Sequence, residues 1–90
     1  MRLDKFLKVA RLAKRRTAAK EALDAGRIEC AGRPVKASHQ VKPGDILMLH
    51  YASRDVCVRV IAVPERAGAR IDPDTLYVTL SDERVGQPNS

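Results

Sequence analysis

The hydrophobic residues of this chain change their spacing from 3.6 to 2 near Gly26, and no other feature limits its possible folds as strongly. Before Gly26, apolar residues recur at the spacing of one helical face, and these are Leu3, Phe6, Leu7 and Ala10. They predict a helix over about residues 3–12. A second helix is predicted over about residues 16–25, followed by Gly26 in the position that glycine favours after a helix. Its inward residues are expected to be Ala18, Ala19, Ala22 and Leu23.

After Gly26 the alternating pattern predicts β-strands. Residues 27–36 are expected to form a hairpin with Ala31 and Gly32 near its turn, and Pro43-Gly44 suits a type II turn before the apolar run at 46–51. Further strands are predicted within 55–63 and 76–80, with a loop between them. We therefore expect an α+β fold in which two short N-terminal helices pack on a small antiparallel sheet. Residues 1–84 are expected to form one domain and residues 85–90 a flexible tail.

The positive charge of the chain is concentrated in its first half. Residues 1–50 contain 12 Lys and Arg and 5 Asp and Glu, a net charge of +7, whereas residues 51–90 contain 5 and 6, a net charge of −1. The segment 8–20 alone contains six cations and no acidic residue. A basic surface confined to one half is typical of a domain that binds a polyanion, and we favour nucleic acid over a membrane surface. A solvated basic face without a ligand is the alternative.

The cations expected to contact nucleic acid lie on both predicted helices and just after them. They are Arg2, Lys5, Lys8 and Arg11 from the first helix, Lys14, Arg15, Arg16 and Lys20 around the second, and, in second rank, Arg27, Lys36 and Lys42. Arg2 and Arg16 are the leading candidates, because a guanidinium can hold a phosphate through two donors. Asp4 is expected to support the site, either by stabilising the helix N-terminus or by orienting neighbouring cations. Its spacing also permits an ion pair with Lys8.

Patterns of catalytic or metal-binding residues are not found in the sequence. It has no glycine-rich phosphate loop, no HExxH motif and no GxSxG motif, and we expect neither an enzyme nor a cofactor. Cys30 and Cys57 have no CxxC spacing, and neither His39 nor His50 has a Cys or Asp partner at ligand spacing, so no metal site is expected. Asp45 is expected to form a hydrogen bond within its turn. A start without an apolar signal segment predicts a cytoplasmic protein.

Four motifs together resemble the S4-type RNA-binding domain, also called the alpha-L motif. They are RLDKFL at 2–7, RTAAK at 16–20, GRIECAGRPVK at 26–36 and VKPGD at 41–45. The resemblance covers residues 2–51, and one departure is Ala31, where the family more often has asparagine. Because asparagine adopts a positive φ more readily than alanine, this departure allows a different hairpin turn.

Within this family, the chain is similar to the short ribosome-associated proteins of the RqcP group, which begin MRLDKFLK and continue KRRTxAKE. This resemblance implies binding to the rRNA of the large ribosomal subunit and to the P-site tRNA of stalled, split ribosomes. It also implies a partner factor that directs alanine tailing of the nascent chain. Two alternatives stay open. One is the recycling role of the related fifteen-kilodalton heat-shock protein, and the other is a protein-interaction module whose basic patch binds an acidic surface.

Overall fold

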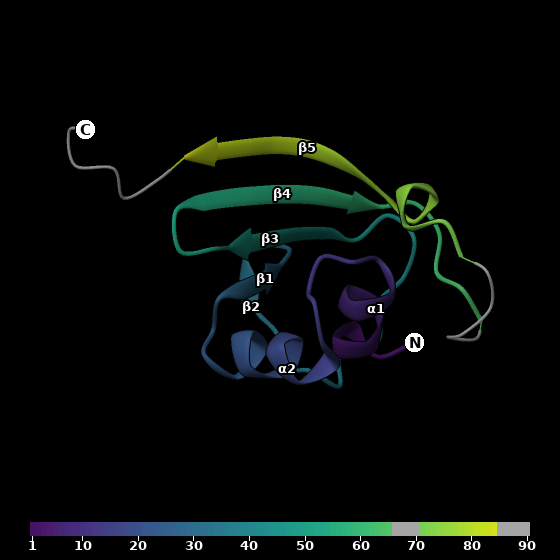
Figure 1. Cartoon of the computed structure of the whole chain (residues 1–90), viewed down its shortest axis with the longest axis horizontal. Coiled ribbons are helices and arrows are strands. Elements are labelled where there is room, and N and C mark those ends of the chain that lie inside the picture. Colours follow the sequence, from purple (N-terminus) through teal and green to yellow (C-terminus); the bar gives the residue numbers. More distant parts are fainter. Residues whose placement is uncertain (66–70, 85–90) are drawn as a thin grey trace.

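The computed structural model describes residues 1–65 and 71–84, which form two helices on a five-stranded antiparallel sheet (Figure 1). The elements are α1 (Leu3–Val9), α2 (Arg16–Asp24), β1 (Ile28–Cys30), β2 (Arg33–Pro34), β3 (Ile46–His50), β4 (Arg54–Val60), the short 3-10 helix η1 (Pro73–Thr75) and β5 (Tyr77–Arg84). The strand order is β2-β1-β3-β4-β5. The expected α+β architecture is confirmed, and the predicted tail at 85–90 lies outside the described residues.

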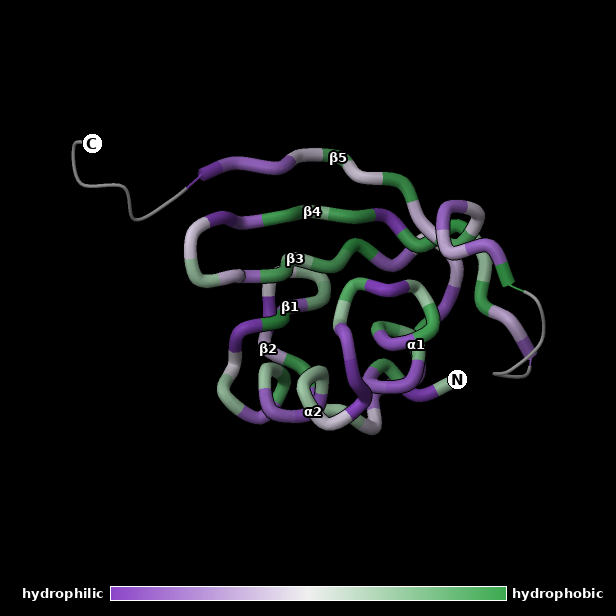
Figure 2. The backbone as a smooth tube through the Cα atoms, in the orientation of Figure 1, coloured by the Kyte–Doolittle hydropathy of each residue, from purple (hydrophilic) through white to green (hydrophobic). Residues whose placement is uncertain are grey.

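The two helices lie together at the β1–β3 end of the sheet, and β5 forms the opposite edge (Figure 1). Their apolar faces enclose the core with the inner face of β3 and β4. Figure 2 shows hydrophobic residues following these two strands, whereas the far half of β5 is hydrophilic. Phe6, Leu7, Leu47 and Val58 are completely buried. Each such side chain contributes about 1.5–3 kcal/mol by leaving water. None of the described helices is both long and apolar enough to cross a bilayer.

Helix α1 ends at Val9, three residues earlier than the period predicts. The chain leaves the helix through Arg11, whose φ is +59°. The N–H of Arg11 donates to the Lys8 carbonyl at 3.0 Å, and the N–H of Leu12 donates to the Leu7 carbonyl at 2.9 Å. This pair of bonds is a Schellman motif, which usually has glycine in the left-handed position. The sequence prediction is wrong here because an arginine occupies that position.

Helix α2 follows its prediction closely. It ends at Asp24, and Gly26 takes the left-handed position at φ +74° in a second Schellman motif. Ala19 and Leu23 are buried, as expected, and Ala22 is half-buried. Ala18, however, is exposed, because it lies on the rim of the packed face rather than within it.

Two turns next to the strands have the glycines that their geometry requires. Ala31 and Gly32 link β1 to β2 with φ values of +56° and +80°, which corresponds to a type I′ turn. The turn is therefore the one that asparagine would favour, and Ala31 adopts it at a cost in backbone strain. At Pro43-Gly44 the N–H of Asp45 donates to the Lys42 carbonyl at 3.1 Å, and Gly44 has φ +95°, which confirms the expected type II turn.

Candidate nucleic-acid interface

Asp4 is buried, and it joins two arginines that lie far apart in the sequence. Its side chain is only 3% exposed, whereas those of Arg2 and Arg16 are 45% and 50% exposed. The Nε atom of Arg2 donates to Oδ1 of Asp4 at 3.3 Å, and the Nε atom of Arg16 donates to Oδ2 at 3.2 Å. The carboxylate thus holds two guanidiniums side by side with their outer edges in solvent. Asp4 does not form the ion pair with Lys8 that the spacing permits, because its carboxylate is buried and pairs with Arg2 and Arg16.

The charge of Asp4 is maintained by its contacts. Burial by itself raises the pKa of this carboxyl group. Hydrogen bonds from Arg16 and from the N–H of Lys5, together with the charges of Arg16 and Arg2, outweigh that effect and lower the pKa below its usual value. Asp4 is therefore a carboxylate at neutral pH, and the two arginines keep one defined position relative to each other.

The segment before β3 supports the start of α1. The carbonyl of His39 accepts a hydrogen bond from the N–H of Leu3 at 2.8 Å, and the carbonyl of Ala37 accepts one from the N–H of Asp4 at 3.3 Å. An isolated β-bridge also pairs Arg2 with Gln40. These bonds satisfy donors that a helix N-terminus leaves without partners, and they fix the direction in which α1 presents Arg2 and Asp4.

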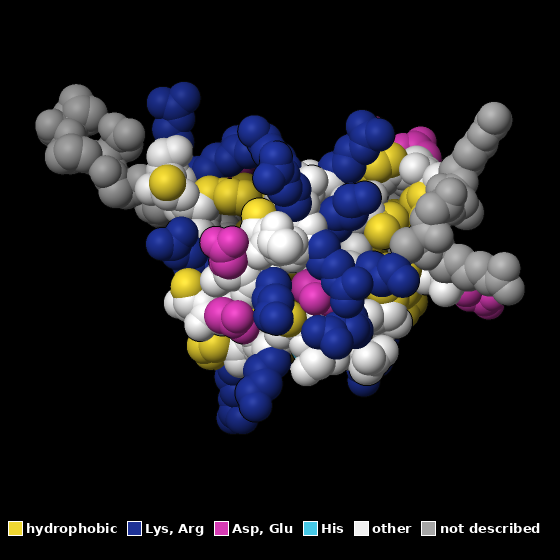
Figure 3. Space-filling model, turned by 60° about the horizontal axis from the view of Figure 1, so that its bottom comes forward, with side chains coloured by type: hydrophobic (Ala, Val, Ile, Leu, Met, Phe, Trp, Pro, Cys, Tyr) yellow, Lys and Arg dark blue, Asp and Glu magenta, His cyan; other side chains and the backbone are white. Residues whose placement is uncertain are grey.

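The predicted cations of both helices lie on one side of the molecule. Figure 3 looks onto the side of the helices, where Lys and Arg side chains gather with acidic side chains scattered among them. Along this region most of the cations are exposed and Lys5 is half-buried; the exposed ones are Arg2, Lys8, Arg11, Lys14, Arg15, Arg16 and Lys20. Arg15 precedes α2 and Arg16 begins it, so the chain direction changes between two neighbouring arginines.

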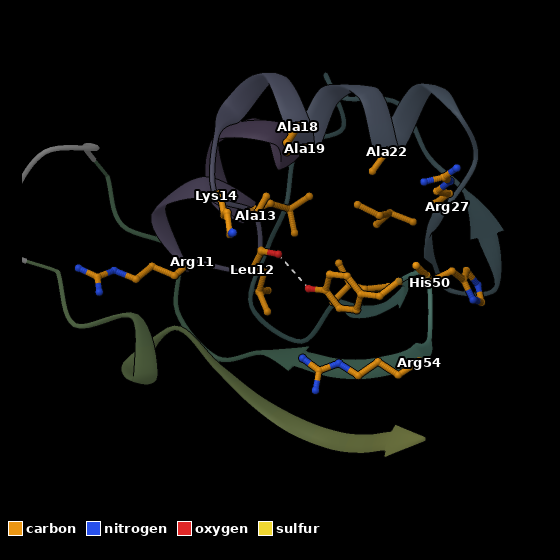
Figure 4. A pocket seen from close by; sticks show the side chains of 15 residues that line it. Arg11, Leu12, Ala13, Lys14, Ala18, Ala19, Ala22, Arg27, His50 and Arg54 are labelled. Carbon is orange, nitrogen blue, oxygen red and sulfur yellow. Dashed lines mark hydrogen bonds between the residues drawn. The ribbon is translucent and has the colours of Figure 1, made fainter. Parts of the chain in front are cut away.

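A hollow of about 480 Å³ lies beside some of these cations (Figure 4). It lies between the α1–α2 connection, α2 and the β3–β4 turn, and alanines from α2 form part of its wall. Arg11, Lys14 and Arg27 contribute to its lining, although the side chain of Arg11 extends away from the others in Figure 4. A second hollow, of about 560 Å³, is lined by Arg2 and Lys36 on the far side of α2. Some of the predicted residues thus line one of the two hollows, and the others lie outside both.

Tyr51 and Arg54 belong to the first hollow, and the sequence analysis missed both. The guanidinium of Arg54 lies 5.6 Å from the centre of the Tyr51 ring. The hydroxyl of Tyr51 donates to the Leu12 carbonyl at 2.8 Å, which ties the β3–β4 turn to the α1–α2 connection (Figure 4). Burial raises the pKa of Tyr51, so the hydroxyl stays protonated as a donor. No sequence signal could have found this pair, because the chain must fold before the turn meets the connection.

His50 lies beside this hollow and interacts with two acidic side chains. Its Nδ1 atom is 2.8 Å from Oδ1 of Asp55, and its Nε2 atom is 3.7 Å from Oε2 of Glu29. The hydrogen bond with Asp55 is the main cause that raises the pKa of His50, and the charges of both acids add to it. The antiparallel register of β3 and β4 places His50 directly opposite Asp55.

Comparison with known proteins gives concordant results. A family model described as the S4 domain matches residues 1–47. The chain is 45% identical over 87 residues to the RQC P-site tRNA stabilizing factor of Bacillus subtilis, an alignment that covers 97% of this chain and 100% of that protein. It is 42% identical over 87 residues to the protein of the same name from Halalkalibacterium halodurans, covering 97% and 98%. It is 45% identical over 78 residues to the one from Helicobacter pylori, covering 87% and 93%.

A solved structure has the same fold. The trimeric structure of Heat Shock Protein 15 from Vibrio cholerae superimposes with a TM-score of 0.79 over 88% of this chain and 80% of that chain, at 24% sequence identity. At this identity the likeness concerns the fold alone. The sequence relatives, in contrast, match over nearly the full length of the chain. The chain therefore belongs to the S4-domain family and, within it, to the group of RQC P-site tRNA stabilizing factors.

Proposed function

We propose that this protein binds the large ribosomal subunit during ribosome-associated quality control and stabilises the peptidyl-tRNA in the P site. The relatives that match 97% of the chain are named for stabilisation of P-site tRNA. The observation that carries the proposal for this chain is the pair of guanidiniums that Asp4 holds at the junction of the two helices. Two positioned arginines can contact neighbouring phosphates of a folded RNA, and such contacts recognise backbone shape rather than base sequence.

Cations line two different hollows, which supports contact with two RNA segments. Arg2, Arg16 and Lys20 would contact one segment along the helices. Lys14 and Arg27, at the hollow, would contact the other. A P-site tRNA and an rRNA hairpin provide two such segments. The RNA-binding residues of this proposal are Arg2, Lys5, Lys8, Arg11, Lys14, Arg15, Arg16, Lys20, Arg27 and Lys36, and Asp4 orients Arg2 and Arg16.

The protein would act as a binding factor in the cytoplasm and not as a catalyst. Its contribution would be to keep the tRNA in place while a separate tailing factor directs the addition of alanine to the nascent chain. The cost of an exposed cationic surface is then offset only when RNA is bound, because phosphates neutralise the repulsion between neighbouring like charges.

Sedimentation with purified large subunits, with and without bound peptidyl-tRNA, tests this proposal. We expect the protein to follow the tRNA-bearing subunits, and Arg16→Ala to weaken this binding about tenfold or more, the loss of one charged hydrogen bond. Arg59→Ala is the matched control, because Arg59 is an exposed arginine of β4 on the other side of the sheet from the core. Circular dichroism and thermal unfolding check that both variants are folded.

Three outcomes would contradict the proposal. The protein could remain at the top of the gradient, it could bind subunits equally with and without peptidyl-tRNA, or Arg59→Ala could weaken binding as much as Arg16→Ala. Alanine tailing reconstituted with and without the protein separates quality control from recycling. A protein that moves tRNA to the P site without supporting tailing would have the recycling role.

A further inference from the structure

Three potential metal ligands from separate parts of the sequence meet beside β1. Cys30 ends β1, His39 lies in the segment before β3, and Asp45 follows the Pro43-Gly44 turn. One ligand atom from each, the Cys30 Sγ, a His39 ring nitrogen and an Asp45 carboxylate oxygen, lie within 4.8 Å of one another. It is the one group of three such donors found among the described residues. None of these three side chains is among the predicted RNA-binding residues.

The side chain of His39 has a free ligand atom directed into this group. Its Nε2 atom is fully enclosed by the protein and makes no hydrogen bond with any atom of residues 1–65 and 71–84. Oδ2 of Asp45 is 3.6 Å away, beyond hydrogen-bond distance. An enclosed polar nitrogen without a partner is costly and calls for an explanation. A metal ion between the three side chains would provide one.

The distances fit a small tetrahedral ion. Ligands bound at about 2.0–2.3 Å in a tetrahedron lie roughly 3.3–3.8 Å from each other. The 3.6 Å separation of His39 Nε2 and Asp45 Oδ2 is within this range. Small side-chain rotations would bring Cys30 into it, because the whole group already lies within 4.8 Å. A thiolate, an imidazole and a carboxylate are the three ligand types that Zn²⁺ accepts together.

We propose that Cys30, His39 and Asp45 bind one Zn²⁺ ion, with water as the fourth ligand. Binding would displace the proton of the Cys30 thiol into solvent, so the sulfur would coordinate as a thiolate. Asp45 would coordinate through one carboxylate oxygen. Its Oδ2 atom accepts from the N–H of Lys42 at 3.0 Å, and this contact keeps the carboxylate facing the other ligands. All three ligands are at least partly buried.

The ion would tie β1 to the segment that holds α1. His39 provides the carbonyl that accepts from Leu3 at the start of α1, and Asp45 ends the turn that leads into β3. A metal clip between three segments restricts the unfolded chain and therefore stabilises the fold. This is a structural role, and it holds whether or not the protein binds RNA.

Titration of the reduced, full-length protein with Co²⁺ is the direct test. Co²⁺ bound by a thiolate gives an intense charge-transfer absorption in the near ultraviolet, and tetrahedral coordination gives strong bands in the visible. We expect both to saturate at one Co²⁺ per chain and to disappear when Zn²⁺ is added. Zn²⁺ itself should raise the melting temperature of the protein, because it binds the native state.

The chain provides matched controls for each type of ligand. Cys30→Ser and His39→Asn should abolish the charge-transfer band and the Zn²⁺-induced rise in melting temperature. Cys57→Ser and His50→Asn should keep both, because Cys57 and His50 belong to no three-donor group in the described part of the chain.

The wild-type spectrum decides the matter even if one of the ligand variants is unfolded. A wild-type titration without a charge-transfer band overturns the proposal. So does a band that survives Cys30→Ser or one that is lost with Cys57→Ser.

Discussion

Asp4 shows how a single residue can position a charged surface. Its carboxylate is buried, and yet both its partners extend into solvent with nearly half of their side chains exposed. A buried carboxylate needs positive partners to remain ionised, and the fold supplies Arg2 from just before α1 and Arg16 from α2. The same interaction therefore stabilises the junction of the helices and orients the guanidiniums.

Replacing Asp4 by asparagine should affect stability and binding together. We expect Asp4→Asn to lower the free energy of unfolding by about 1 kcal/mol at neutral pH, because both ion pairs are lost. The loss stays this small because the two exposed arginines regain water when the charge is removed. Subunit binding should weaken in addition, because Arg2 and Arg16 are no longer held. Asp82→Asn is the control, since Asp82 forms an exposed ion pair with Arg54 and should change stability by less than about 0.5 kcal/mol.

The pH dependence of this effect follows from the lowered pKa of Asp4. The unfolded aspartate titrates at about pH 4, and the folded one titrates lower. The stabilisation is therefore complete above about pH 4 and is lost as the pH falls through the folded-state pKa. Denaturant unfolding at several pH values should show the stabilities of wild type and Asp4→Asn converging below about pH 4. A constant difference across the acid range would contradict this account.

At the end of α1, backbone strain coincides with a residue of the candidate interface. Arg11 has a φ of +59° at a position that favours glycine, and Ala31 has a similar φ of +56° in the β1–β2 turn. A residue with a Cβ loses about 1–2 kcal/mol in this conformation. Strain at a cationic residue of the candidate interface agrees with a role for its side chain in binding.

Glycine at these two positions should separate stability from binding. We expect both Arg11→Gly and Ala31→Gly to raise the free energy of unfolding by about 0.5–1 kcal/mol, after the greater freedom of glycine in the unfolded chain is subtracted. Only Arg11→Gly should weaken subunit binding. Denaturant unfolding and sedimentation measure the two effects. A loss of stability in Arg11→Gly, or a loss of binding in Ala31→Gly, would show that the backbone conformation has a different role.

At the scale of the whole molecule, the charges are segregated. Eight of the twelve cations of residues 1–50 lie on the helices or next to them, whereas β5, at the other edge of the sheet, includes Asp82, Glu83 and Arg84. An uneven distribution of this kind favours one orientation towards a polyanion. It also makes the strength of binding depend on salt in proportion to the number of phosphate contacts.

The salt dependence of binding measures the number of phosphate contacts made at the first hollow. We expect the logarithm of the affinity for large subunits to fall linearly with the logarithm of the salt concentration. Replacing Lys14 and Arg27 together by alanine should reduce the magnitude of this slope by about 1.4–1.8, which corresponds to the loss of two phosphate contacts. Removing Arg59 and Arg84 together is the control, because both are exposed arginines of β4 and β5. An equal change in both double variants would indicate a general effect of net charge.

Short-range patterns determined the elements of this fold. The hydrophobic period of 3.6 predicted both helices. Gly26 predicted the end of α2, and Pro43-Gly44 predicted the turn before β3, because these features depend on residues close together in the chain. The positive charge of the first half and the S4 motifs are likewise visible in the amino-acid sequence itself. The end of α1 could not, since an arginine adopts there a conformation that sequence rules assign to glycine.

Only the tertiary structure decided which distant side chains meet. Asp4 accepts a hydrogen bond from Arg16, which is 12 positions away in the sequence, and Tyr51 donates one to Leu12, which is 39 positions away. Cys30, His39 and Asp45 show no ligand spacing in the sequence, and yet the fold brings them together. The physical reason is the same in each case. Local propensity depends on neighbours along the chain, whereas a site depends on the packing that closes long loops, and no local pattern records which residues that packing makes adjacent.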